Sequence, residues 1–393
     1  NTQIFNEKIK KEILNINKKI NLELKSVKIL INPFNFSANI KTIDPEIIFN
    51  NKNIKLNYIN TNVSFKSLIN QKIKIDDLKI STKKNKIKDI VSLTRLFKDN
   101  TELFLLEKII KRGFLTGEIN LNLDEEGKIK KDYLIKGFIN NGSVSLLREY
   151  SIKDLNLDFK IENKNYLLKD IRAELDQLKI SSSLIKIKKK DNLLVIEGKI
   201  NNAEKKINLK LLNNLLGETI KNFNLENLEL SSENDFSFNI NKKYKINNFI
   251  LKSKINLDNV DYKTQLPFLK NFLPNFNNLI KLQNHKILIN YKKNVLNIEG
   301  KGNISIKGAD DYFDYKLSKD NNGYKFDTIF NIEKNQFLID ALNYKKNKDL
   351  KASLKLKGIY NKNKQLKFST ILFTDEEKSK FLINDLNLNK EFK

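Results

Sequence analysis

The side chains that most often perform catalysis are scarce in this chain, and one residue stands out. His285 is the only histidine, and the chain has no cysteine. A lone histidine can act as a general base, but no nucleophile or orienting acid is marked beside it. Without cysteine there are no thiol nucleophiles, cysteine-ligated zinc sites or disulfides. We therefore interpret His285 as an ordinary core or surface residue.

An acidic cluster and a glycine pair are the remaining candidates for ligand chemistry. Asp310, Asp311 and Asp314 follow Gly308 and could bind a cation, but they lack the ligand spacing of a calcium loop, so a solvated turn is the better interpretation. The Gly-Lys-Gly stretch at 300–302 does not extend into a dinucleotide or phosphate motif. The sequence thus predicts no catalytic residue, no metal and no cofactor, and we expect that the protein is not an enzyme.

The charge of the chain is large but spread out. Its 393 residues carry a net charge of +26, nearly all of it from lysine. Nucleic-acid-binding proteins usually rely on arginine for bidentate contacts, and only Arg95, Arg112, Arg148 and Arg172 are present. The joint excess of Lys, Asn and Ile is what an AT-rich coding sequence produces. We therefore predict no nucleic-acid partner, while attraction to an anionic membrane surface stays compatible with the charge.

Alternation of apolar and polar residues is the main structural signal. A period of two indicates a strand with one apolar face and one solvated face. The clearest stretch covers residues 133–187, and the pattern returns further along the chain. The apolar positions that we select as candidate ligand-contacting residues are Leu155, Leu157, Phe159, Ile161, Phe236, Phe238, Ile240, Ile287 and Ile289.

Turn sequences separate these alternating stretches. Asn141-Gly142 and Asn322-Gly323 suit tight turns, because both residue types tolerate positive φ. We therefore predict a mainly β fold, an elongated, twisted antiparallel sheet of repeated hairpins that is curled into a groove. A few short amphipathic helices accompany it.

A short signature recurs within the strands: apolar, any, Asp or Asn, apolar, any, apolar. The interval of three between its first two apolar residues breaks strict alternation. A bulge or corner at the Asp or Asn explains this, since the short side chain can hydrogen-bond nearby backbone. Chance matches are expected in this composition, but we interpret the set as a degenerate β repeat. Copies begin at Ile75, Ile152, Leu225, Ile246, Leu257 and Ile383, with a weaker one at Leu168.

Helical spacing of apolar residues is confined to four segments. We predict helices near 3–20, 87–112, 209–223 and 266–282. The second of these is expected to break at Asp99-Asn100 and to end at Gly113 as a C-terminal cap. No apolar run reaches the roughly 18 residues that a membrane-spanning helix needs.

The apolar strand faces need a cover, and the predicted helices are few. The sheet either folds on itself as a sandwich or closed barrel, or it forms an open groove whose apolar face meets a ligand. Composition alone favours the sandwich, whereas the chain length and the repeat favour the curled sheet.

The order of these features resembles the AsmA-like superfamily, and most closely its YhdP-type domain. An amphipathic N-terminal helix leads to a strand that ends in Pro33-Phe34, and a Leu/Ile-rich helix ends at Gly113. The run 133–161 then contains Asn141-Gly142 and the alternation Leu155-Leu157-Phe159. On this basis we divide the chain into an N-terminal AsmA-like region, 1–115, and a repeated β-hairpin region, 116–393.

The resemblance implies an envelope protein of Gram-negative bacteria. Such proteins are anchored in the inner membrane, extend into the periplasm and conduct phospholipid acyl chains along a β-groove toward the outer membrane. The expected partners are phospholipid, the inner membrane and outer-membrane or envelope proteins, and we expect an anchor upstream of Asn1 and truncation at both chain ends. The alternative is a non-enzymatic envelope assembly scaffold with a dry β core. A third hypothesis, a nucleic-acid binder, rests on charge alone.

Overall fold

The protein is described here by a computed structural model of the 393-residue chain. The residues that the structure describes are 7, 10, 18–34, 36–64, 75–97, 101–124, 130, 132–146, 150–191, 193–203, 206–209, 224–243, 245–264, 269–361, 365–378 and 380–388. The predicted helix at 3–20 lies almost entirely outside these residues, and so does most of the one at 209–223.

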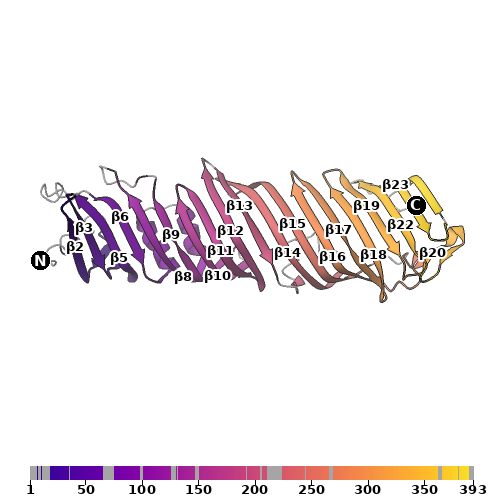
Figure 1. The fold of residues 1–393 in the computed structure, drawn as a ribbon, viewed down its shortest axis with the longest axis horizontal. Coiled ribbons are helices and arrows are strands. Elements are labelled where there is room, and N and C mark those ends of the chain that lie inside the picture. The colour runs from indigo at the N-terminus through magenta and orange to yellow at the C-terminus, as the bar shows by residue number, and fades with distance from the viewer. Residues whose placement is uncertain are drawn as a thin grey trace. The chain divides into compact units, whose positions relative to one another are not determined.

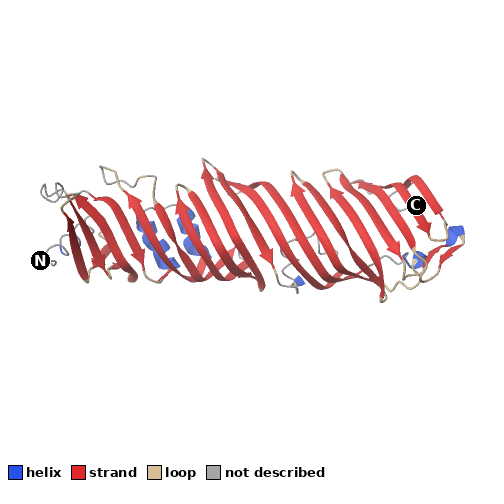
Figure 2. Ribbon diagram, in the orientation of Figure 1, coloured by secondary structure: helices blue, strands red, loops and turns tan. Residues whose placement is uncertain are grey.

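The fold is mainly β, as predicted. Among the described residues, twenty-two strands belong to an antiparallel sheet that does not close on itself, and β20 and β21 form a separate two-stranded hairpin (Figures 1 and 2). Most neighbouring strands in the sheet are also neighbours in the sequence, so the sheet is a succession of hairpins. This confirms the predicted class and the predicted hairpin organisation.

By packing, the chain divides into two compact units. The first contains Asn1–Asp176 and Ser181–Val195, and the second contains Gln177–Ile180 and Ile196–Lys393. This boundary falls within residues 176–196, whereas the sequence features place one at residue 115. β12 (Leu178–Lys190) and β13 (Leu193–Asn202) contribute residues to both units.

Eleven of the described strands and two of the described helices lie wholly in the first unit. They are β1 (Ile20–Glu23), β2 (Ser26–Asn32), β3 (Ser37–Ile43), β4 (Glu46–Phe49), β5 (Lys52–Ser64), β6 (Ile75–Thr82), β7 (Asn85–Lys86), α3 (Ile87–Phe97), α4 (Thr101–Ile109), β8 (Ile110–Asn122), β9 (Leu134–Leu146), β10 (Tyr150–Glu162) and β11 (Asn165–Leu175).

The second unit is built almost wholly of strands. Its elements are β14 (Asn224–Asn241), β15 (Ile246–Lys263), α7 (Leu269–Phe272), β16 (Leu279–Lys292), β17 (Val295–Ile306), β18 (Ala309–Lys319), β19 (Gly323–Ile332), β20 (Phe337–Ile339), the 3-10 helix η1 (Asp340–Leu342), β21 (Tyr344–Lys346), β22 (Ala352–Asn361), β23 (Leu366–Asp375) and β24 (Lys380–Leu388).

The recurring Asp/Asn signature marks irregular strand positions, as predicted. Asp154, Asn227 and Asn248 adopt positive φ of 49°, 49° and 53° inside strands, and strand pairing shifts register beside each of them. Asp77 and Asn259 keep ordinary φ, yet register shifts also lie next to them. Short polar side chains tolerate this left-handed conformation better than most residues do. The bulges therefore give the signature its spacing.

The Asn141-Gly142 turn was predicted wrongly. These residues lie inside β9, which pairs with β8 on one side and β10 on the other. Asn141 has a φ of 50°, and its backbone N–H donates to Asn156 Oδ1 at 3.1 Å. Asn141-Gly142 thus forms a bulge in β9, opposite the bulge in β10. Asn322-Gly323, in contrast, does connect β18 to β19, as predicted.

Two helix predictions also need correction. In the segment 87–112 the described residues form two helices, α3 and α4, and the expected break at Asp99-Asn100 lies outside the described residues. The second helix ends at Ile109, and Gly113 lies within β8 rather than capping a helix. In the segment 266–282, the described residues form only the four-residue α7, and β16 begins at Leu279. Residues 279–282 pair with β15, and residues 281 and 282 also pair with β17, so they form a strand despite their helical spacing.

Helices α3 and α4 cover the apolar face of the first unit. One row of paired residues on that face includes Ile59, Ile80 and Ile119. Leu93 of α3 packs in the cluster that holds Ile59 and Ile80, and Ile87 and Val91 pack with Ile110, near Leu115 and Ile139. In Figure 2 both helices lie behind the strands. The first unit thus has a conventional sheet-and-helix core.

A buried polar clamp closes one end of the second unit. The carboxylate of Asp311 accepts backbone N–H bonds from Glu333 and Lys334 at 2.7 Å and a bond from Asn335 Nδ2 at 2.8 Å. Lys346 is 0% exposed. Its Nζ donates to the carbonyl oxygens of Glu333, Asn335 and Asn347 at 3.1, 2.9 and 2.8 Å. Asp311 was expected in a solvated turn, and that interpretation is wrong.

Candidate functional site

The second unit presents one face of almost purely apolar residues. The strand register places the following residues in one row across β15 to β24, each paired with the next: Ile255, Ile287, Gly300, Tyr315, Thr328, Leu356, Ile371 and Ile383. Because side chains of directly paired residues point to the same side of a sheet, this row defines what we call the apolar face.

The neighbouring row, one residue along each strand, is nearly all polar. It contains Lys254, Leu288, Glu299, Lys316, Asp327, Lys357, Thr370 and Asn384. Leu288 is the one apolar exception. The second unit is therefore a sheet with one apolar and one charged face, as the sequence alternation predicts.

The middle of the apolar face is half-buried. Ile255, Ile287, Ile289, Leu317 and Phe326 are all of intermediate exposure. Side chains of neighbouring strands on the same face account for this partial burial. Two described core clusters pack on this face, and both lie at one end of the strands.

That closed end is covered by three segments. Ile207 packs on Leu228 and Leu257. Leu273 and Phe276, just after α7, join Phe337 of β20 in a cluster with strand residues that include Ile306, Ile332 and Phe373. The opposite strand ends carry the hairpin turns at 241–246, 292–295 and 319–323. No described element covers the apolar face at those turns.

The structure brings five of the predicted contact residues together on the second unit. Ile287 and Ile289 belong to the apolar face, and Phe236 faces the same side through its pairing with Leu251. Phe236 stacks on Phe238 with ring centroids 5.9 Å apart. Ile240 follows on the same strand, two residues further along. All five residues are of intermediate exposure.

The other four predicted contact residues lie on β10 of the first unit. Leu157, Phe159 and Ile161 pair with Ile139, Gly137 and Ile135 on the face that α3 and α4 cover elsewhere. Leu157 is only 8% exposed, whereas Phe159 and Ile161 are half-buried.

Leu155 pairs with Gly142 at the bulge that follows Asp154. The side chain of Leu157 is thus buried in the described structure, while its two neighbours on the same face are more accessible.

Sequence reasoning missed the glycines that shape the apolar face. At Gly300, a Cβ atom would lie 2.3 Å from Cζ of Tyr315, and at Gly302 one would lie 2.4 Å from Cδ2 of His285. Both rings therefore occupy the space that a side chain at these positions would fill, which only glycine allows. The Gly-Lys-Gly stretch at 300–302 has a packing role in the sheet.

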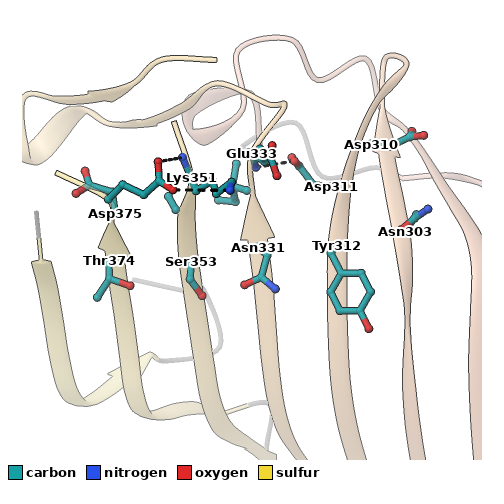
Figure 3. Close-up of a pocket in the computed structure, with 13 residues that line it drawn as sticks. Asn303, Asp310, Asp311, Tyr312, Asn331, Glu333, Lys351, Ser353, Thr374 and Asp375 are labelled. Atoms are coloured by element: carbon teal, nitrogen blue, oxygen red, sulfur yellow. Dashed lines mark hydrogen bonds and ion pairs between the residues drawn. The ribbon is translucent and has the colours of Figure 1, made fainter. Parts of the chain in front are cut away.

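A shallow polar pocket lies on the charged face at the closed end. Its volume is about 520 Å³. Figure 3 shows Asn303, Tyr312, Asn331, Ser353 and Thr374 side by side on neighbouring strands. Asp311 turns from this rim toward the backbone of Glu333, so its carboxylate is already occupied. Within the described ranges, no group of three or more His, Asp or Glu side chains could hold a metal ion.

His285 is a core residue, in keeping with its interpretation from sequence. It is 1% exposed, and its Nε2 lies 2.9 Å from the carbonyl oxygen of Asn303, an acceptor that requires the proton on Nε2. The Nδ1 atom is buried and has no hydrogen-bond partner. Burial lowers the pKa of His285 below its usual 6.5, against the opposing effect of the Asn303 carbonyl. The neutral ring is therefore the folded form.

Acidification is expected to destabilise the protein through His285. Since its pKa is lower in the folded state, its contribution to stability is complete above about pH 6.5 and is lost as pH falls below that value. Thermal melting should give a constant midpoint from pH 8 to 7 and a falling one toward pH 5.5. A His285→Phe variant should lose this slope, because the chain has no other histidine. An equal slope in the variant would assign it to other groups.

Comparison with known proteins leaves the family open. Neither the family models nor the curated proteins nor the solved structures contain a match to this chain. Among the helices that the structure describes, none has the length and apolarity needed to cross a bilayer. The resemblance to the AsmA-like superfamily therefore rests on the order and spacing of residues, and what it implies is carried forward as a proposal.

Proposed function

We propose that the chain binds phospholipid acyl chains on the apolar face of the second unit and conducts them between the inner and outer membranes of a Gram-negative envelope. The observation that carries the proposal is the part of the apolar face toward the hairpin turns, which no described element covers. The paired row Ile289, Ile298 and Leu317 lies outside the described core clusters and has no described covering layer. Monomeric soluble proteins rarely expose large contiguous apolar patches unless these bind something.

The energy available on such a face is sufficient for lipid binding. Burial of acyl chains gains about 0.8 kcal/mol per CH₂ group, so a chain of about 15 such groups gains on the order of 10 kcal/mol at full burial. Half of that would still hold a lipid on a one-sided face. The location in the periplasm and the inner-membrane anchor belong to the same proposal, and they derive from the resemblance alone.

Lipid uptake from vesicles tests the proposal. The purified chain is mixed with vesicles of phosphatidylethanolamine and phosphatidylglycerol, the vesicles are sedimented, and lipid in the protein fraction is identified by mass spectrometry. We expect at least one phospholipid per chain, and lipids of the expression host in the protein as first purified. A lipid content no higher than that of a matched all-β protein without an apolar face would refute acyl-chain binding.

A further inference from the structure

The two ends of the strands in the second unit differ in charge as well as in cover. We define the lysine rim as the exposed or half-buried lysines at the three described turns of the open end. They are Lys242, Lys243, Lys245, Lys292, Lys293 and Lys319. The closed end mixes signs, with Asp310, Asp375 and Glu376 near Lys351. A cationic edge thus runs beside the open end of the apolar face.

The charge of the lysine rim is not neutralised by acids nearby. Asp320 is the one acid in these turns, and its Oδ1 accepts backbone N–H bonds from Asn322 at 2.7 Å and Gly323 at 3.2 Å. Elsewhere in this unit lysines do pair, as Lys263 does with Glu226 at 2.7 Å. In the described residues, no ion pair involves a lysine of the rim. The rim is therefore available to an anionic ligand.

Aromatic rings lie between the lysine rim and the aliphatic part of the apolar face. Phe249 lies 6.3 Å from Phe238 and 5.8 Å from Tyr291, centroid to centroid. Tyr324 lies 6.4 Å from Tyr360.

One of these rings also contacts the lysine rim. Lys319 Nζ lies 5.1 Å from the centre of the Tyr324 ring. Rings with an apolar body and a polar tip, backed by lysine, are typical of sites where hydrocarbon meets headgroup.

We propose that this site binds anionic phospholipids in one orientation. The acyl chains lie along the strands toward the closed end, and the phosphate group contacts the lysine rim. This inference rests on the proposed function. A ten-residue strand such as β19 is about 33 Å long, whereas one bilayer leaflet has a hydrocarbon thickness of about 15 Å. One strand length can therefore accommodate a full acyl chain.

Charge removal at the rim tests the headgroup preference. The triple variant Lys242→Gln, Lys243→Gln, Lys292→Gln is compared with a control triple on the charged face, Lys252→Gln, Lys301→Gln, Lys316→Gln. Both remove three exposed lysines outside any described ion pair. Each lysine near an anionic lipid surface contributes roughly a fivefold increase in affinity.

The readout is uptake from vesicles of phosphatidylglycerol and, separately, of phosphatidylcholine. We expect the rim variant to lose phosphatidylglycerol uptake by one to two orders of magnitude and to keep phosphatidylcholine uptake. The control triple should keep both within about twofold. Equal losses in the two triples, or none in the rim variant, would overturn the inference while leaving acyl-chain binding intact. Failure of the unaltered protein to take up either lipid would instead refute the proposed function.

Orientation is tested with single tryptophans, since the chain has no native one. Tyr324→Trp and Phe330→Trp place reporters on the same face of β19, six residues and about 20 Å apart. A phosphatidylglycerol analogue with a nitroxide on its headgroup should quench the residue 324 reporter at least threefold more strongly. A nitroxide at the acyl-chain end should reverse this order.

Melting curves establish that both tryptophan variants are folded. Equal quenching at the two positions, or the opposite order, would show that the phosphate does not lie at the lysine rim. Vesicle binding that depends on the rim without lipid uptake would also overturn the inference, since it would assign the rim to the bilayer surface.

Discussion

Replacing Lys346 with methionine is expected to lower the melting midpoint of the second unit by roughly 10 °C. The ammonium group of Lys346 is fully buried and donates to three backbone carbonyl oxygens. Burial lowers the pKa of Lys346, and attraction to Asp311, Asp349 and Glu333 opposes this effect. Removing one partner of a buried charged group typically costs about 3–5 kcal/mol, and 1 kcal/mol shifts the midpoint of a unit of this size by about 2–4 °C.

The loss of stability in this variant should begin in the segments around Lys346. Lys346 connects β21 to the 333–335 segment, which in turn is capped by Asp311. Loss of the ammonium group leaves unpaired carbonyls beside the covering segment that contains Phe337. Hydrogen exchange should therefore increase first in residues 333–350. The adjacent Lys345 is exposed, so Lys345→Met is the matched control and should melt within about 1 °C of the parent. Equal midpoints for the two variants would contradict the clamp.

Ile289→Asp is expected to abolish lipid uptake and to leave the fold intact. Ile289 lies on the apolar face between Ser253 and Ile298, where it is half-buried. With lipid absent, water reaches the introduced carboxylate, so the cost to stability should stay at about 1 kcal/mol, as for a typical point mutation. With lipid present, the carboxylate would lie against hydrocarbon, where an unpaired charge is strongly unfavourable. We expect bound phospholipid to fall at least tenfold.

Two control variants distinguish loss of lipid binding from unfolding of the protein. Asn290→Asp places the same charge one residue away, on the exposed charged face, and should affect neither stability nor lipid. Ile332→Asp places it in the closed end, where Ile332 is 0% exposed, and should unfold the unit. If Ile289→Asp also unfolds the protein, the apolar face is a dry core and the scaffold hypothesis gains. If it folds and keeps its lipid, the ligand lies elsewhere.

Much of the sheet could be predicted because its strands and bulges follow from short sequence patterns. Period-two alternation at Phe236, Phe238 and Ile240 predicts a strand with one apolar face, and β14 is that strand. The Asp/Asn signature predicted bulges at positions such as Asp154 and Asn227, where positive φ is found. Both patterns depend on the backbone and side chain of a few consecutive residues.

Other local structures depend on contacts with segments that are distant in the sequence. Asn141-Gly142 and Asn322-Gly323 are alike in sequence, yet only the second pair forms a turn. The first pair lies inside a strand because β8 and β10 pair with β9 on both sides of it. Asp311 looks like a solvated turn residue until the 333–335 backbone donates hydrogen bonds to its carboxylate.

The sequence by itself determined which residues share a face of the sheet, since alternation follows from the strand geometry of each residue. It did not determine which apolar faces are covered. That was decided by tertiary structure, because α3 and α4 pack on the face of the first unit, whereas the described covering segments of the second unit reach only one end of the strands. Coverage depends on contacts between segments far apart in the chain, and no local pattern encodes them.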